Sequence, residues 1–134
     1  MNGKCREYNY EGELFFEGEY LYGKRNGRGK EYYNNDKIKF EGEYLNEERN
    51  GKCKQYSYDG ELEFEGEYLN GDRWNGKGKE YNYKDELLFE GEYLNGKKNG
   101  KGKEYNKNGK LIYEGEYLNG KSNGKGKEYD NDGN

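Results

Sequence analysis

Carboxylates are the most abundant reactive side chains in this sequence, but the residues that usually work with them are missing. The chain has 28 Asp and Glu residues and no His, and its only serines are Ser57 and Ser122, both in turn-like segments. A serine triad and histidine-based proton transfer are therefore excluded. Pairs such as Glu17 and Glu19 recur along the chain, but lysines on a facing strand explain them. We expect no catalytic residues and no enzyme.

Metal ligands are equally scarce. Zinc sites need clustered Cys and His, whereas Cys5 and Cys53 stand far apart in the sequence. Residues 130–133 (Asp-Asn-Asp-Gly) are similar to the start of a calcium loop, but the glycine position and closing Glu of such a loop are missing. An Asx-rich turn is the expected structure there, so we predict no metal and no cofactor.

The strongest pattern in the chain is an internal repeat. A phrase close to Phe-Glu-Gly-Glu-Tyr begins at five positions, which are Phe16, Phe40, Phe64, Phe89 and Tyr113. The steps between them are 24 or 25 residues, and such a period indicates an array in which each unit contacts its neighbours. We therefore expect one domain over residues 1–134, with a half repeat at 2–15 followed by five full repeats.

Each repeat has the pattern of a β-hairpin. In residues 113–117, aromatic residues and Gly alternate with Glu, which is the period of a strand with two unlike faces. An Asn-Gly turn follows at 119–120, and residues 124–127 then alternate Gly with Lys. A helix is excluded because each glycine costs about 1 kcal/mol against Ala. The predicted fold is all-β: an elongated single-layer antiparallel meander of consecutive hairpins.

The alternation predicts one face of aromatic rings over glycines and one face of paired Glu and Lys. Rings can cover neighbouring glycines, and Glu114 and Glu116 are expected to meet Lys125 and Lys127. Tyr129 breaks the alternation, so either a bulge or a Tyr that points the other way is needed there. A single-layer sheet cannot hide both faces, and we therefore predict that the aromatic face binds a partner. The predicted contact residues are Phe16, Tyr20, Phe40, Tyr44, Phe64, Tyr68, Phe89, Tyr93, Tyr113 and Tyr117.

Composition restricts the class of protein further. Hydrophobic residues are 28% and charged residues 39%, which would suggest disorder, but aromatics reach 17% and sit at fixed places in the period. We therefore expect a folded chain with a thin core. The formal charge of −4 gives no general attraction to nucleic acid. The chain lacks an apolar run near 18 residues and an N-terminal signal-peptide pattern, so a cytoplasmic location is predicted.

The two cysteines occupy glycine positions of the repeat. If each repeat contributes two strands about 4.8 Å apart, they are separated by four strands, or roughly 19 Å. A disulfide needs Cα atoms within about 7 Å. We predict that Cys5 and Cys53 are free thiols in a reducing compartment.

Two further features vary between repeats. Trp74 is the extra residue of the 25-residue repeat, and it is expected at a loop tip, either as a binding anchor or packed on the adjacent loop. Basic residues in register form a predicted basic edge, which Glu47 and Glu48 interrupt. Such an edge is either a solvated, charge-balanced surface or a weak electrostatic contact to anionic lipid. The basic-edge residues are Lys24, Arg25, Lys97, Lys98 and Lys121.

The repeat resembles the membrane occupation and recognition nexus (MORN) repeat. Residues 89–102 read Phe-Glu-Gly-Glu-Tyr-Leu-Asn-Gly-Lys-Lys-Asn-Gly-Lys-Gly, and the pattern recurs over residues 3–133. The resemblance implies a twisted antiparallel meander of hairpins and carries no catalytic residues over. Lys-Glu-Tyr after the paired glycines differs from the more frequent Thr-Tyr. In that respect the chain is similar to bacterial members of the family, some of which are antitoxin or immunity proteins.

The function expected from the sequence is a non-catalytic repeat scaffold that binds another protein. The alternatives are a weak adaptor for anionic lipid and an antitoxin or immunity protein. The array shows no obvious terminal caps, so self-association through its ends or membership of a longer array is also expected.

Overall fold

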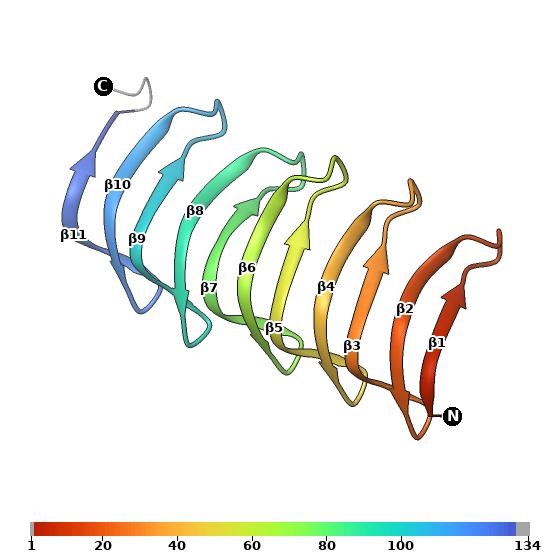
Figure 1. The fold of residues 1–134 in the computed structure, drawn as a ribbon. Coiled ribbons are helices and arrows are strands. Elements are labelled where there is room, and N and C mark those ends of the chain that lie inside the picture. Colours follow the sequence, from red (N-terminus) through yellow and green to blue (C-terminus); the bar gives the residue numbers. More distant parts are fainter. Residues whose placement is uncertain (1, 131–134) are drawn as a thin grey trace. The chain divides into compact units, whose positions relative to one another are not determined.

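The computed structural model describes residues 2–130, which contain strands and turns and no helix. Eleven strands follow one another in chain order, and consecutive strands run antiparallel (Figure 1). The predicted all-β meander of consecutive hairpins is therefore confirmed. The chain forms two compact units, residues 1–73 and 74–134.

The first unit contains six strands and the start of a seventh. Each of its neighbouring pairs from β1 to β6 is antiparallel. The strands are β1 (Gly3–Tyr8), β2 (Leu14–Leu21), β3 (Lys24–Tyr32), β4 (Ile38–Leu45), β5 (Glu48–Tyr56) and β6 (Leu62–Leu69).

The second unit repeats the same arrangement. Its strands are also antiparallel to their neighbours. They are β7 (Asp72–Tyr81, which begins in the first unit), β8 (Leu87–Leu94), β9 (Lys97–Tyr105), β10 (Leu111–Leu118) and β11 (Lys121–Glu128).

The short hairpin turns at 70–71, 95–96 and 119–120 follow from their Asn-Gly sequences. In the turn between β6 and β7, Asn70 has φ +50° and Gly71 has φ +90°, the left-handed pair that a two-residue hairpin of the right twist requires. Glu47 occupies the glycine position of the β4–β5 turn and has φ +77°. Its carboxylate accepts a hydrogen bond of 2.7 Å from the backbone N–H of Arg25, which helps to hold this unfavourable conformation.

Asparagine side chains connect successive turns. The side-chain oxygen of Asn50 accepts a hydrogen bond of 3.0 Å from the backbone N–H of Asn70, and Asn75 does the same for Asn95 at 2.9 Å. These bonds explain why Asn recurs at this position of the repeat.

Bulges bend the lysine-bearing strands. In β3 the bulge contains Gly27, whose φ is +104°, and the next N–H, that of Arg28, donates a 2.6 Å hydrogen bond to the Glu19 carboxylate. Lys52 donates to Glu43 in the same way at 2.8 Å. The second Glu of each Glu-Gly-Glu therefore caps a bulge in these repeats, a role that alternation alone did not predict.

The aromatic rings form the core by packing on glycine backbone and on one another. Phe16, Phe40 and Phe64 are fully buried. A Cβ added at Gly29 would lie 2.7 Å from the Phe16 ring, so only a small residue allows this contact. The predicted packing of rings over glycines is confirmed.

The ambiguity at Tyr129 is resolved by its equivalents in earlier repeats. Strict alternation holds: Glu104 lies on the aromatic face and bonds Tyr117. Tyr105 therefore lies on the opposite face, where its hydroxyl donates a 2.8 Å hydrogen bond to Glu90. The Tyr after the Gly-Lys-Glu segment therefore points away from the aromatic face. A bulge is also present, but it lies in the following strand, β10, where the register shifts between Leu111 and Tyr113.

Candidate functional site

Cationic side chains lie across the buried rings and cover the aromatic face. The Arg25 guanidinium carbon is 3.9 Å from the centre of the Phe16 ring, and its Nε is 2.9 Å from the Glu7 carboxylate. The same arrangement recurs in the next repeats, with Arg49 over Phe40. A guanidinium above an aromatic face is held by both the ring quadrupole and the carboxylate.

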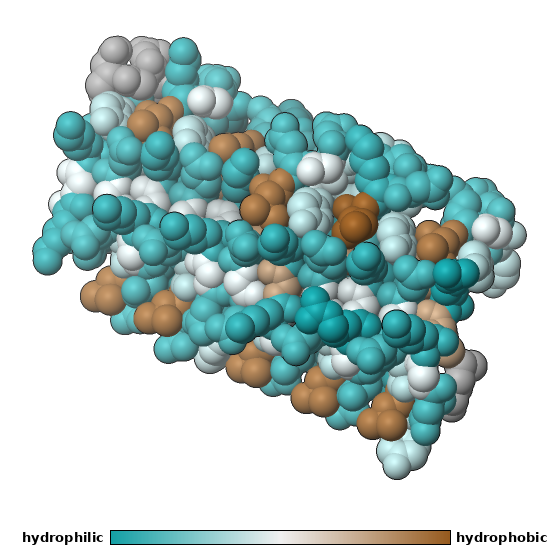
Figure 2. All heavy atoms as spheres, in the orientation of Figure 1, coloured by the Kyte–Doolittle hydropathy of each residue, from teal (hydrophilic) through white to brown (hydrophobic). Residues whose placement is uncertain are grey.

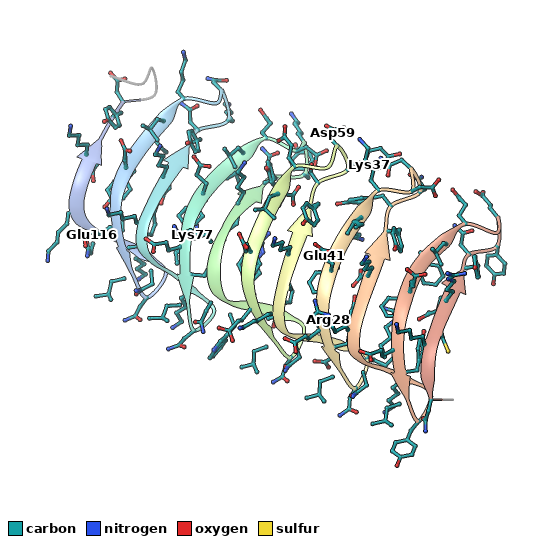
Figure 3. The ribbon with its side chains drawn as sticks, viewed as in Figure 1. Arg28, Lys37, Glu41, Asp59, Lys77 and Glu116 are labelled. Carbon is teal, nitrogen blue, oxygen red and sulfur yellow. The ribbon has the colours of Figure 1, made fainter. Side chains whose placement is uncertain are left out.

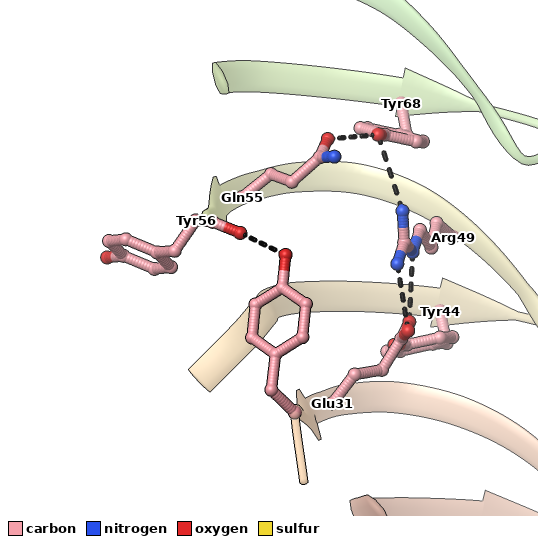
Figure 4. A network of polar contacts seen from close by, with 7 residues as sticks. Glu31, Tyr44, Arg49, Gln55, Tyr56 and Tyr68 are labelled. Carbon is pink, nitrogen blue, oxygen red and sulfur yellow. Dashed lines mark hydrogen bonds and ion pairs between the residues drawn. The ribbon is translucent and has the colours of Figure 1, made fainter. Parts of the chain in front are cut away.

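Arg49 is the centre of the best-connected example (Figure 4). Its guanidinium donates two hydrogen bonds to Glu31, at 2.9 Å and 2.8 Å, and a third of 3.4 Å to the Tyr68 hydroxyl. That hydroxyl in turn donates to Gln55 at 2.5 Å. Tyr44 also donates to Glu31. The network joins β3, β4, β5 and β6 across the first unit.

The network changes the acidity of its members. Burial alone would raise the pKa of Glu31, but hydrogen bonds from Arg49 and Tyr44 outweigh it and hold that pKa below its usual value. Burial and the Glu31 carboxylate raise the pKa of Tyr44 well above its usual range. Glu31 is therefore an ionised structural acceptor and is poorly suited to proton transfer.

The second unit uses a weaker form of the same arrangement. The Lys98 ammonium is 4.3 Å from the centre of the Phe89 ring and 3.6 Å from the Glu80 carboxylate. In the last repeat Ser122 occupies the position of the cation. Lys98 is therefore the last residue in chain order that places a cation over a ring at this position of the repeat.

Burial limits what the ten predicted contact rings can do directly. Nine of them are at most 8% exposed, and Tyr20 of the first repeat is half-buried. These rings belong to the core, so a partner at this face would meet the Arg, Lys, Glu and Tyr polar groups that lie over them. A role of this face in binding stays a prediction.

The predicted basic edge separates into two sets. Arg25 and Lys98 lie over rings of the aromatic face, as described above. Lys24, Lys97 and Lys121 are exposed beside the short hairpin turns. Each of the repeats that contain these residues therefore has one exposed lysine of the predicted basic edge beside its short hairpin turn.

Trp74 lies inside β7 and not at a loop tip. It is half-buried, and its carbonyl accepts a 2.8 Å hydrogen bond from Gly96. The preceding residue, Arg73, lies over the Phe64 ring, with its guanidinium carbon 4.8 Å from the ring centre. In the other repeats a single residue such as Lys98 both lies over a ring and accepts the backbone hydrogen bond from the next turn. In the 25-residue repeat these two contacts are made by two residues, Arg73 and Trp74. A role as a binding anchor stays a prediction.

The opposite face carries the alternating charges. Lys54 and Glu65 approach to 3.9 Å and Lys103 and Glu114 to 3.7 Å, and all four side chains are exposed. In the first unit this face is hollowed by a cavity of about 880 Å³ that spans β1 to β4. Arg28 and Glu41, which help to line it, are labelled in Figure 3.

Sequence reasoning missed a row of exposed leucines, which we name the leucine margin. Each leucine is the last residue of a Glu-Gly-Glu-Tyr-Leu strand and stands directly before a short hairpin turn. The members are Leu21, Leu45 and Leu69 in the first unit and Leu94 and Leu118 in the second, and they are between 37% and 56% exposed. In Figure 2, exposed hydrophobic residues are visible at the end of each unit where the short hairpin turns lie. The signal was present in the sequence, since the same Leu recurs beside a polar turn in every full repeat.

Cys5 and Cys53 are free thiols, as predicted, and burial raises the pKa of Cys53 to about 11. Within residues 2–130 there is no group of three or more potential metal-ligating side chains and no helix that could span a membrane. Residues 131–133 of the predicted Asx-rich turn lie outside the described part of the chain.

Comparison with known families agrees with the structure. The MORN repeat model matches residues 16–37, 40–61, 89–110 and 113–134, which is about two thirds of the chain. The repeat that begins at Phe64 is the one with the extra residue in β7, and it is not among the matched segments. A search of curated proteins gives no match. The chain belongs to the MORN repeat family.

Proposed function

We propose that this protein is a non-catalytic repeat scaffold that binds another protein through the leucine margin. The observation that carries the proposal is the exposure of one leucine at the same place in every full repeat. Leu45, for example, is 49% exposed and Leu94 50%. Single apolar residues are normal on protein surfaces, but here an exposed leucine recurs at the same position of each repeat, which supports a binding role.

The way the rings are packed supports this choice of surface. Phe40 and Phe64 are fully buried and covered by Arg49 and Arg73, so the sheet satisfies its own aromatic residues. Because Arg side chains lie over the rings, the exposed surfaces of the leucines remain available for contact with a partner. Neighbouring members of the margin within a unit are two strands apart, roughly 10 Å.

The residue inventory supports a role in binding over catalysis. The chain has no His, its most connected carboxylate, Glu31, is held ionised by Arg49, and its most buried thiol, Cys53, has a raised pKa. The two free thiols also support our proposal of a cytoplasmic, reducing compartment.

The experiment that tests this function compares partner binding by variants of the leucine margin with binding by a control variant on the charged face. Leu45→Ser and Leu94→Ser should fold normally and lose a partner that co-purifies from the native source and is then identified by mass spectrometry. The control is Lys54→Ser on the charged face, where the side chain is 49% exposed. Binding of the purified partner is measured by calorimetry, and equal affinity for all three variants would exclude the leucine margin.

A contact with anionic lipid is the second candidate, and one observation favours it. In the second unit, Leu94 and Leu118 stand close in sequence to the exposed Lys97 and Lys121, and apolar residues next to lysines suit a lipid interface. Flotation with vesicles containing phosphatidylserine tests this function, because Lys97→Ala with Lys121→Ala should abolish lipid binding and leave a protein partner bound. An antitoxin or immunity role rests on the family resemblance.

A further inference from the structure

A row of apolar side chains crosses the charged face of the first unit, beside the longer turns at 9–13, 33–37 and 57–61. Each hairpin contributes a Tyr and the aliphatic residue directly opposite it on the next strand, and such directly opposite residues share a face. Tyr32 faces Ile38 and Tyr56 faces Leu62. We name this row the tyrosine strip, and its members are Tyr8, Leu14, Tyr32, Ile38, Tyr56 and Leu62.

The strip is held in place but only partly covered. The Tyr32 hydroxyl donates a 3.2 Å hydrogen bond to Glu17 of the preceding strand, and the Tyr56 hydroxyl donates one of 3.0 Å to Glu41. Both tyrosines are half-buried, and Leu62 is 42% exposed. The rings of the strip are therefore oriented by the sheet and still present apolar surface to solvent, unlike the buried rings of the aromatic face.

A ligand on this strip has to bind through side chains. The strands β2, β3, β4 and β5 are each paired with two neighbours, so their main-chain groups are used within the sheet. A ligand that adds a β-strand needs free main-chain groups. A polyproline II segment has no such need, because its backbone stays solvated and its side chains dock on aromatic surfaces.

The spacing of the strip favours the same conformation. Successive tyrosines of the strip are two strands apart, or about 9.6 Å, and a polyproline II helix repeats every three residues, over about 9.3 Å. Every third residue of such a helix can therefore meet one Tyr over several turns. Residues on one face of a β-strand recur at about 6.7 Å, and two turns of an α-helix span about 10.8 Å. Both lose register with the strip more quickly.

The cavity of the charged face borders the strip, and its carboxylates are hydrogen-bonded within the chain. The three that line it are Glu17, Glu19 and Glu41. Glu17 accepts a 2.8 Å hydrogen bond from Arg6, in addition to the tyrosine bond described above. Glu19 accepts its bond from the backbone N–H of Arg28. These acceptors leave little capacity for cationic groups of a ligand.

Three cations of the same cavity, Lys4, Arg28 and Lys30, are exposed. Within residues 2–130, no ion pair or side-chain hydrogen bond holds them. Arg28 is labelled in Figure 3. Lys30 lies two residues before Tyr32 on β3, so both side chains are on one face. The cavity therefore favours carboxylates of a ligand that lies along the strip.

We propose that the tyrosine strip binds a proline-rich, acidic segment of a partner protein in the polyproline II conformation. Every third residue of the segment is a proline, which lies on one Tyr and its aliphatic neighbour. An acidic residue of each turn reaches the cations of the cavity. The stiff polyproline II helix loses little conformational freedom on binding, so modest side-chain contacts suffice.

This surface is distinct from the leucine margin, because Leu14 begins β2 and Leu21 ends it. The inference is therefore independent of the proposed function. The probe is a fluorescein-labelled peptide of four Pro-Pro-Glu repeats, and its binding is followed by fluorescence anisotropy. Backbone amide NMR shifts of the unmodified chain locate the contact. We expect the largest shifts around Tyr32, Tyr56 and the cavity, and weaker binding as salt is raised.

Two control peptides test conformation and spacing. Four Gly-Gly-Glu repeats keep the charges and the period but form a flexible coil. Four Pro-Pro-Pro-Glu repeats keep the charges and the polyproline II helix but change the period of the acidic residues from three to four. Each peptide should bind about tenfold more weakly than the Pro-Pro-Glu peptide.

Variants of the chain test the two parts of the site. Tyr32→Ser with Tyr56→Ser should weaken binding about tenfold, whereas Tyr22→Ser, at an 82% exposed Tyr of a short hairpin turn, should leave it unchanged. Arg28→Glu with Lys30→Glu should weaken binding of the Pro-Pro-Glu peptide and strengthen binding of a Pro-Pro-Lys peptide. Circular dichroism checks that each variant keeps its β-spectrum.

Several results would overturn the inference. Equal binding of the Gly-Gly-Glu peptide would show a general attraction of acidic chains, and equal binding of the period-four peptide would show that the spacing is not read. Shifts centred on the leucine margin, or no binding of the Pro-Pro-Glu peptide, would exclude the strip. Leu45→Ser should leave peptide binding unchanged, so failure at the strip and failure at the leucine margin are separate outcomes.

Discussion

Arg49 lies over Phe40, with its guanidinium carbon 4.2 Å from the ring centre. The ring is completely buried although the sheet is a single layer. Arg49 also holds Glu31 by two hydrogen bonds, so one side chain covers the core and joins two strands. This relationship explains how a chain with 28% hydrophobic residues can bury a core. Long cationic side chains do the covering that a second layer does in other folds.

The first prediction concerns the relative weight of the two faces. Phe40→Ala should lower the free energy of unfolding by about 3–5 kcal/mol, because the ring is fully buried. Exchanging Lys54 and Glu65 should change it by less than about 1 kcal/mol, because both side chains are about half exposed. Urea unfolding followed by circular dichroism measures both values. Equal losses would show that the charged pairs contribute as much as the rings.

The second prediction distinguishes two kinds of glycine. A Cβ at Gly18 would lie 2.7 Å from the Arg28 carbonyl oxygen and from the Gly29 Cα, which are backbone atoms. A Cβ at Gly29 would meet mainly the ends of the Phe16 and Tyr44 rings. Gly18→Ala should therefore cost about 3 kcal/mol or more and Gly29→Ala about 1–2 kcal/mol.

Thermal and urea unfolding of the two variants check this order. Cys53 already stands at the position equivalent to Gly29, which indicates that the rings can shift to admit a Cβ. The reverse order of stabilities would mean that the strands separate more easily than the rings move.

The third prediction is a loss of stability in acid. The pKa of Glu31 is lower in the folded chain than its usual value, so Glu31 stabilises the fold fully above about pH 4. This contribution is lost as the pH falls through the folded pKa, because protonation ends the ion pair with Arg49. Urea midpoints at pH 7 and pH 3 should therefore differ less for Glu31→Gln than for the unchanged chain.

A double-mutant comparison controls for the many other carboxylates. In an Arg49→Met background, Glu31→Gln should alter the acid dependence less than in the unchanged chain, because only the hydrogen bond from Tyr44 remains. An undiminished effect would show that Arg49 does not hold the pKa of Glu31 low.

The fourth prediction concerns the two thiols. Cys53 is 7% exposed and burial raises its pKa to about 11, whereas Cys5 is half-buried in the first strand. A thiol reagent at pH 8 should modify Cys5 quickly and Cys53 far more slowly, since the thiolate is the reactive form. Denatured, unreduced chain should give two thiols, and Cys5→Ser should remove only the fast phase. A mapped bridge between the two cysteines would contradict the strand order.

The sequence by itself determined the fold class, because a regular repeat leaves few arrangements open. Alternation with period two requires strands, Asn-Gly requires tight hairpin turns, and the recurrence of Phe16, Phe40 and Phe64 requires the same packing in each repeat. The separation of Cys5 from Cys53 followed from the same register. These inferences rest on local backbone preferences, which act over a few residues and are visible in the sequence.

Only the tertiary structure decided where the long side chains go. Arg25 and Lys98 look like members of a basic edge in the sequence, but they reach across the sheet to rings and carboxylates of neighbouring strands. Glu19 and Glu43 cap bulges, which alternation could not predict, because a bulge depends on how two strands pair. The exposure of the leucine margin is likewise a property of the assembled sheet. Each of these outcomes depends on contacts between residues about 10 to 20 positions apart, which a sequence pattern read along one strand does not contain.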